Sequence, residues 1–191
     1  MKKLIILLLT AFVLSSCSAK PAQQTTTTAV VTASADAWEY EFYIEDIDYY
    51  MTKYVDATEK IAEANELMDY VAAKEAYGDC VQALDKFYEI TYPAPLEEKH
   101  SKFLSAIDNE KRINEILESM CSFYVKYDSY EPELTPEEQT EMQNLQDEFN
   151  RIFDESTNDI SLWDAKNAVL EEAYSYLGLT FEQNITYIYE E

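Results

Sequence analysis

A long helical repeat runs through the middle of the chain. Between residues 96 and 124, mostly apolar residues recur at alternating spacings of three and four, as in an α-helix with one buried face. The stripe consists of Leu96, His100, Phe103, Ile107, Glu110, Asn114, Leu117, Cys121 and Tyr124. Four apolar residues widen it, as in a bundle helix: Leu104, Ile113, Ile116 and Met120. Since Pro93 and Pro95 disfavour helix immediately before them, the pattern predicts a helix from about residue 95 to residue 127.

Two segments before this one show the same repeat. A first helix is expected from about residue 37, with the stripe Tyr40, Tyr43, Ile47, Tyr50, Tyr54, Ile61 and Met68. A second helix is expected to end at the prolines and carries Cys80, Leu84, Phe87 and Ile90. We place the break between the two near Asp69 to Ala73, with Gly78 as the competing breakpoint.

A fourth helix has recognisable ends. Thr135 and Pro136 stand where an N-cap and a first helical residue belong, and Gly178 stands where a left-handed residue closes a helix. Between them the apolar residues keep the helical repeat, apart from a small slip before Ile160. One helix from about residue 136 to residue 177 is therefore expected.

Glycine and proline are scarce, and this narrows the fold class. The 191 residues include only two glycines and five prolines, so there is little material for the tight turns of a many-stranded β fold. Four helices joined by short connections favour an all-α domain over residues 36–191, an up-down-up-down bundle of about four helices. Residues 179–191 are expected to form a short helix against the bundle or a frayed tail.

The N-terminus carries an export signal. Lys2 and Lys3 precede an apolar run from Leu4 to Leu14, which is too short to span a membrane. The residues Leu14-Ser15-Ser16-Cys17 resemble the lipobox of bacterial lipoproteins. The resemblance implies that residues 1–16 are a signal peptide, that cleavage occurs before Cys17, and that the Cys17 thiol receives a diacylglycerol.

The next segment differs from the rest in composition. Residues 17–35 are rich in Thr, Ala and Gln and contain no acidic residue, which is typical of a flexible tether. A coil of this length has an end-to-end distance of roughly 24 Å. We therefore expect a domain held by acyl chains in the lipid bilayer at the extracytoplasmic face of the cell membrane. The alternative for Ala29 to Thr32 is an extra strand.

Charge and composition exclude several function classes. The chain has 38 acidic and 14 basic residues and a formal charge of −24, whereas nucleic-acid binders need Lys and Arg. Two glycines cannot form a phosphate-binding loop or a dinucleotide fingerprint, and no Gly-x-Ser-x-Gly elbow is present. His100, with Glu97 three residues before it, is the only histidine, whereas a di-iron bundle needs two such motifs. We expect no enzyme, no cofactor, no metal site and no nucleic-acid partner.

Two cysteines remain besides Cys17. A turn centred near Ala94 would place Cys80 opposite about residue 108, roughly 20 Å from Cys121 by helical rise. A disulfide needs Cα atoms within about 7 Å, so two free thiols facing the core are expected.

The acidic residues offer one alternative, a calcium site. The stretch from Asp154 has oxygen ligands at its first, third and fifth positions. It has Asp159 where a calcium-binding EF-hand loop needs glycine, and Ala165 where it needs glutamate. The stretch is therefore interpreted as a solvated face, and a weak cation site is the alternative.

Tyrosine is unusually frequent, with 16 residues. Its ring packs well in half-buried seams of a bundle, and it serves equally well in recognition surfaces because its hydroxyl stays hydrated. Most of the tyrosines are expected in the core or at its boundary. A possible interaction surface is assigned to Trp38, Tyr49, Tyr127 and Tyr130; Tyr49 lies off the main stripe of its helix.

These features together predict a non-enzymatic surface lipoprotein. Its role would be that of an interaction or scaffold module that binds an envelope protein of unknown identity. The alternative is a lipoprotein that binds a small ligand or a cation such as Ca²⁺ in the bundle core, with Ser156, Asn158 and His100 near the site.

Overall fold

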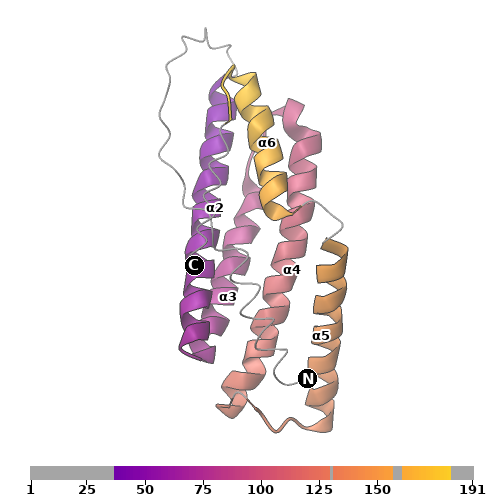
Figure 1. The fold of residues 1–191 in the computed structure, drawn as a ribbon. Coiled ribbons are helices and arrows are strands. Elements are labelled where there is room, and N and C mark those ends of the chain that lie inside the picture. Colours follow the sequence, from indigo (N-terminus) through magenta and orange to yellow (C-terminus); the bar gives the residue numbers. More distant parts are fainter. Residues whose placement is uncertain (1–36, 130, 157–160, 182–191) are drawn as a thin grey trace, which may run out of the picture.

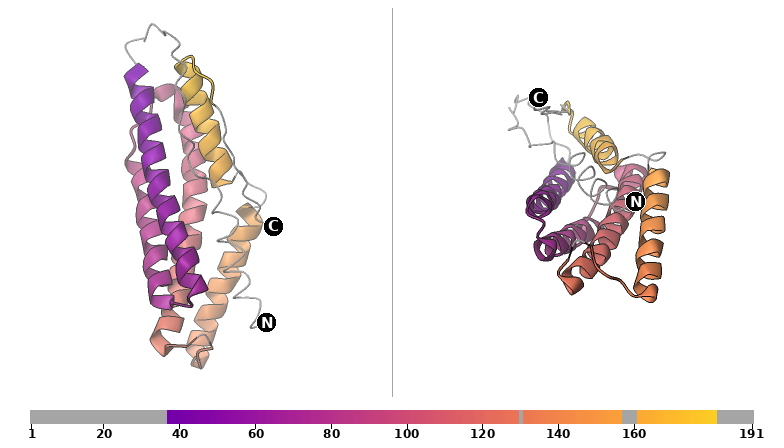
Figure 2. Two further views of the ribbon diagram at one scale, coloured as in Figure 1. Left: turned by 60° about the vertical axis from the view of Figure 1, so that its left-hand side comes forward. Right: turned by 60° about the horizontal axis from the view of Figure 1, so that its bottom comes forward.

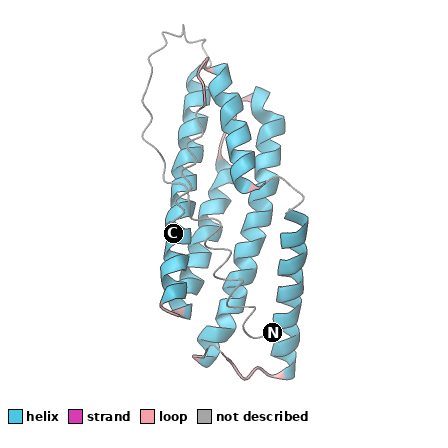
Figure 3. Cartoon of the chain, viewed as in Figure 1, coloured by secondary structure: helices cyan, strands magenta, loops and turns pink. Residues whose placement is uncertain are grey.

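The chain forms an all-α bundle in a computed structural model that describes residues 37–129, 131–156 and 161–181. Figure 3 shows helices joined by loops, and no strand occurs within these ranges. The helices are α2 (Ala37–Glu66), α3 (Tyr70–Asp85), α4 (Glu97–Tyr127), α5 (Pro136–Ser156) and α6 (Leu162–Tyr176), with short 3₁₀ helices at Lys86–Glu89 and Ala94–Leu96. The predicted fold class is confirmed.

The turn between α2 and α3 lies at Asp69, as predicted, and Gly78 is inside α3. The Asp69 side chain caps α3 by accepting a hydrogen bond from the Ala72 backbone N–H at 3.0 Å. The prediction that Met68 belongs to the core stripe of α2 was wrong. Met68 has a left-handed backbone with φ 53° and is 67% exposed, because the helix has already ended at Glu66.

The connection between α3 and α4 is longer than the sequence pattern predicts. α3 ends at Asp85 rather than at the prolines, and the 3₁₀ helix and an extended stretch follow. The ion pair between Asp85 and Lys111 shows that these residues lie at the same level of the two antiparallel helices, so Cys80 lies opposite about residue 116. The cysteines therefore lie at closer levels than predicted, yet Cys80 and Cys121 are both buried and no disulfide joins them, as expected.

The main stripe of α4 is buried as predicted. Eight of its nine members are less than 9% exposed, and the ninth, Glu110, is half-buried. Two of the rings in contact at the centre, those of Phe87 and Phe103, have centroids 5.3 Å apart. The helix closes at Asp128, which has φ 47°.

The expected fourth helix is two helices. α5 begins with a reciprocal cap in which the Glu138 backbone donates to Thr135 Oγ1 and the Thr135 backbone donates to Glu138, as the sequence suggests. α6 has its own N-cap, because Ser161 Oγ accepts from the Asp164 backbone N–H at 3.1 Å. Gly178, with φ 68°, follows the end of α6, as predicted.

α5 and α6 differ in the helices that they contact. α2, α3 and α4 form a long three-helix layer, and α6 lies against the upper half of α4 (Figure 1). Among the described helices, α6 approaches both α4 and α2, whereas α5 comes close to α4 alone. Figure 2 shows α5 standing at the outer edge of the bundle.

Candidate functional site

The outer face of α2 carries exposed aromatic side chains. Trp38 is 55% exposed, Phe42 59% and Tyr49 58%. Their spacings of four and seven residues place them within one narrow line along the helix. We call these three residues the aromatic stripe.

The stripe follows from the way α2 is buried. The opposite face of the helix holds Tyr43, Ile47 and Tyr54, each at most 2% exposed, against α3 and α6. Since no residue of the stripe shares that face, a well-packed core leaves Trp38, Phe42 and Tyr49 in solvent. The sequence predicts Trp38 and Tyr49 at such a surface but misses Phe42. The missed signal is its spacing, four residues after Trp38 and seven before Tyr49.

Ring contacts hold the stripe in place. The rings of Trp38 and Phe42 meet edge to face, with centroids 5.9 Å apart. Tyr49 meets Tyr50 in the same way at 5.2 Å, and the Lys53 ammonium lies over the Tyr49 ring. Tyr50 in turn contacts the buried ring of Phe87 at 5.9 Å. Tyr49 is thus connected to the core through Tyr50, whereas Trp38 and Phe42 support each other.

Acidic residues surround the stripe. Glu41, Glu45 and Asp46 are exposed on the same turns of α2. Within residues 37–129, 131–156 and 161–181, no salt bridge involves any of the three. The surface is therefore aromatic, and its three carboxylates outnumber the one ammonium group at the stripe, that of Lys53.

The other two predicted surface residues lie elsewhere. Tyr127 is at the far end of α4, where it is half-buried and its hydroxyl donates to Glu138 Oε2 at 2.6 Å. Lys126 also pairs with Glu138, and these hydrogen bonds lower the pKa of Glu138 to about 2. The geometry gives Tyr127 a role at the turn before α5. Tyr130, like the proposed lipidation site Cys17, lies outside the described residues.

His100 is part of the core. It is 2% exposed, and its Nδ1 lies 2.8 Å from the Tyr43 hydroxyl. The Tyr92 ring stacks on it with centroids 4.2 Å apart. Burial lowers the pKa of His100, so the neutral imidazole is favoured. His100 is therefore a packed and hydrogen-bonded side chain of the core.

The Cys80 and Cys121 side chains also lie in the core. Cys80 is fully buried, and Cys121 is 2% exposed. Burial raises the pKa of Cys121 to about 12, so its thiolate, the nucleophilic form, is not populated near neutral pH.

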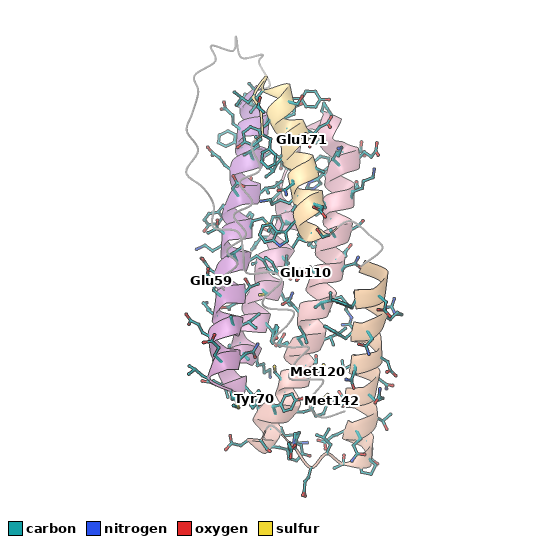
Figure 4. The ribbon with its side chains drawn as sticks, viewed as in Figure 1. Glu59, Tyr70, Glu110, Met120, Met142 and Glu171 are labelled. Carbon is teal, nitrogen blue, oxygen red and sulfur yellow. The ribbon has the colours of Figure 1, made fainter. Side chains whose placement is uncertain are left out.

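Glu110 is the carboxylate that enters the bundle interior. Its Oε1 accepts from the Tyr54 hydroxyl of α2 and from Asn114 Nδ2 at 3.5 Å. Burial raises the pKa of Glu110, and the two hydrogen bonds act in the opposite direction. Figure 4 shows Glu110 at the middle of α4, close to the level at which α6 begins. The helical repeat predicts that Glu110 faces inward, but not which groups it meets.

The described part of the chain contains no group of three or more His, Cys, Asp or Glu side chains that could hold a metal ion. In the candidate calcium stretch, Asn158 and Asp159 lie outside the described residues, as does the side chain of Ser156.

None of the helices in the described ranges is both long enough and apolar enough to span a membrane. A scan against protein-family models found no match to this chain, and searches of curated proteins and of solved structures found none either.

Proposed function

We propose that this protein is a lipid-anchored module of the cell envelope that binds another protein through the outer face of α2. The observation that carries the proposal is the aromatic stripe. Three large rings that lie 55–59% exposed on one line are unlike scattered surface residues, and aromatic side chains are enriched where proteins bind each other. The interaction would be non-enzymatic.

The anchor is the second part of the proposal. The lipobox-like residues Leu14 to Cys17 support acylation at the extracytoplasmic face of the cell membrane. Replacement Cys17→Ser is expected to abolish incorporation of a labelled fatty acid. The protein should then no longer fractionate with membranes. Labelling of the Cys17→Ser variant at the wild-type level would contradict the anchor.

The buried titratable groups support a non-enzymatic role. The only histidine is fixed between Tyr43 and Tyr92, and the Cys121 thiol is held in its protonated form. Neither group is presented at a surface where a substrate could meet it.

Chemical cross-linking in intact envelopes tests the proposal. The full chain serves as bait beside a variant with Trp38→Ala and Tyr49→Ala. The matched control carries Leu67→Ala and Val71→Ala. These two residues are exposed around the turn between α2 and α3, at the other end of α2 from the stripe. We expect one specific partner that the stripe variant loses and the control variant keeps. A partner retained equally by all three proteins would contradict the assignment of the face.

A small-ligand or cation site in the core is a second candidate function, and the half-buried carboxyl group of Glu110 favours it. The test is the melting temperature of the full chain with Ca²⁺ or with small amines, beside Glu110→Gln. A rise that the variant lacks would support a site at Glu110. Equal behaviour of both proteins would remove this candidate.

A further inference from the structure

The spacing of the aromatic stripe indicates the shape of its partner. Trp38, Phe42, Glu45 and Tyr49 follow one another at steps of four, three and four residues. This is the spacing with which one helix packs along another. The line spans 12 residues, about 16 Å of helix from the first to the last, and all four side chains are exposed. The shape complementary to such a line is a second helix laid along α2.

The charge beside the stripe indicates the sign of that partner. Glu45 lies within this line, and Glu41 and Asp46 lie on either side of it. All three are exposed, and none of them forms a salt bridge with another described residue. In paired helices, charges beside the apolar seam select the partner, and like charges there oppose association. A helix that covers the rings therefore gains most when Lys or Arg side chains flank its own apolar seam.

The same charge argues against three other occupants. A second copy of this chain would bring the same three acidic groups against themselves. An anionic membrane surface would be repelled by them. The C-terminal residues 182–191 contain three glutamates and no Lys or Arg, so this segment has the wrong sign as well.

We propose that the occupant of this face is a basic amphipathic helix of a partner protein. Its apolar side chains cover Trp38, Phe42 and Tyr49, and its Lys or Arg side chains lie beside Glu41, Glu45 and Asp46. The rings supply the buried area, and the carboxylates supply the preference for a positive partner. This inference rests on the proposed interaction function of the stripe.

A designed peptide tests the inference directly. The probe is a helical peptide of three heptads with Leu at the seam positions and Lys and Ala elsewhere, free of Trp and Tyr. Two matched peptides carry Glu or Gln in place of Lys. The full chain in a non-ionic detergent carries Trp163→Phe, which leaves Trp38 as its only tryptophan. Binding is followed by the fluorescence of Trp38, which shifts to shorter wavelength when the ring is covered.

We expect the Lys peptide to bind and the Glu peptide to fail. Phe42→Ala and Tyr49→Ala should each weaken binding about tenfold, because central aromatic residues carry most of the affinity of an interface. The triple variant Glu41→Gln, Glu45→Gln, Asp46→Asn should also weaken it about tenfold and flatten its dependence on salt.

A second triple variant separates local complementarity from net charge. Glu133→Gln, Glu137→Gln and Glu141→Gln remove the same charge from exposed sites around the start of α5, far from the stripe. We expect this variant to change binding by less than about twofold. Equal weakening by both triple variants would overturn the inference, as would equal binding of the Gln or Glu peptide.

The envelope cross-linking experiment distinguishes this inference from the proposed function. If the stripe variant loses its partner but the Lys peptide does not bind, the interaction face stands and the basic helix is wrong. If neither a partner nor the peptide binds, both proposals fail.

Discussion

α6 and α5 both run antiparallel to α4, yet they cover it differently. The pair Lys99–Glu172 aligns α6 with the first half of α4, and the pair Arg112–Glu148 aligns α5 with the second half. α6 also reaches α2 and buries six of its side chains, whereas α5 approaches α4 alone among the described helices. Of the α5 side chains that the structure describes, only Phe149 and Ile152 are buried. Both helices are amphipathic, so amphipathic character alone does not determine how strongly a helix is packed into the bundle. The number of neighbouring helices matters as well.

The largest expected effect is the loss of stability when a leucine of α6 or of α5 is truncated. Leu170 of α6 is 2% exposed, whereas Leu145 of α5 is half-buried. Leu170→Ala should lower the free energy of unfolding by about 3 kcal/mol, and the same change at Leu145 by about 1 kcal/mol. Urea unfolding followed by circular dichroism measures both. Equal losses would mean that the two helices are equally integrated.

The raised pKa of Glu110 predicts that the stability of the protein depends on pH. Because burial raises the pKa of Glu110, the folded protein holds this proton more tightly than the unfolded chain. The free energy of unfolding should therefore fall as the pH rises from the ordinary pKa of glutamate through the raised one. Glu110→Gln should remove this dependence and stabilise the protein at pH 7 by on the order of 1 kcal/mol.

Urea unfolding at a series of pH values measures this effect. The exposed Glu59, shown in Figure 4, gives the control variant Glu59→Gln, which should keep the wild-type pH dependence. A Glu110→Gln variant with an unchanged profile would contradict the assignment.

The helix caps should show the same difference between the helices. Thr135→Ala and Ser161→Ala each remove an N-cap, at a cost of about 1 kcal/mol. We expect the loss at Ser161 to appear in global unfolding of the protein. The loss at Thr135 should appear mainly as faster amide hydrogen exchange within α5. If Thr135→Ala lowers global stability as much as Ser161→Ala does, α5 is packed into the bundle as strongly as α6, which would contradict the expected difference.

The smallest effect concerns the ion pairs. Arg112 donates from Nε and from an Nη to the two carboxylate oxygens of Glu148, both at 2.9 Å, on a partly exposed surface. Arg112→Ala should accelerate amide exchange in α5 by about fivefold and leave α6 unchanged. Lys99→Ala removes the looser 3.8 Å pair of α6 and should change exchange there by less than about twofold. Hydrogen exchange detected by mass spectrometry measures both variants.

The sequence predicts what lies along one helix better than what lies between helices. The repeat from Leu96 to Tyr124 predicts which side chains of α4 face inward, and eight of the nine are buried. The same repeat predicts one helix where the structure has α5 and α6. A repeat that slips by a residue or two fits one bent helix as well as two separate ones. Ser161 and Asp164, spaced as an N-cap and its partner, were the available signal.

The candidate site shows the same limit. Trp38 and Tyr49 could be predicted at the surface because they lie off the core stripe. Their exposure together with Phe42 depends on which faces of α2 receive a neighbour, and periodicity does not contain that information. The contact between Tyr54 and Glu110 likewise depends on the alignment of α2 with α4. That alignment follows from turn geometry that no single-helix pattern encodes.

The length of α2 separates its two exposed ends. The helix has 30 residues and spans about 45 Å, with the aromatic stripe in its first turns and the apolar tip of Leu67 and Met68 just beyond its last. In a chain acylated at Cys17, as we propose, the whole bundle is held from the end of α2 that carries the stripe. The distant tip of a body held at one end moves over a wider arc than the end at which it is held. A contact at the stripe would thus restrict less orientational freedom than an equal contact at the tip.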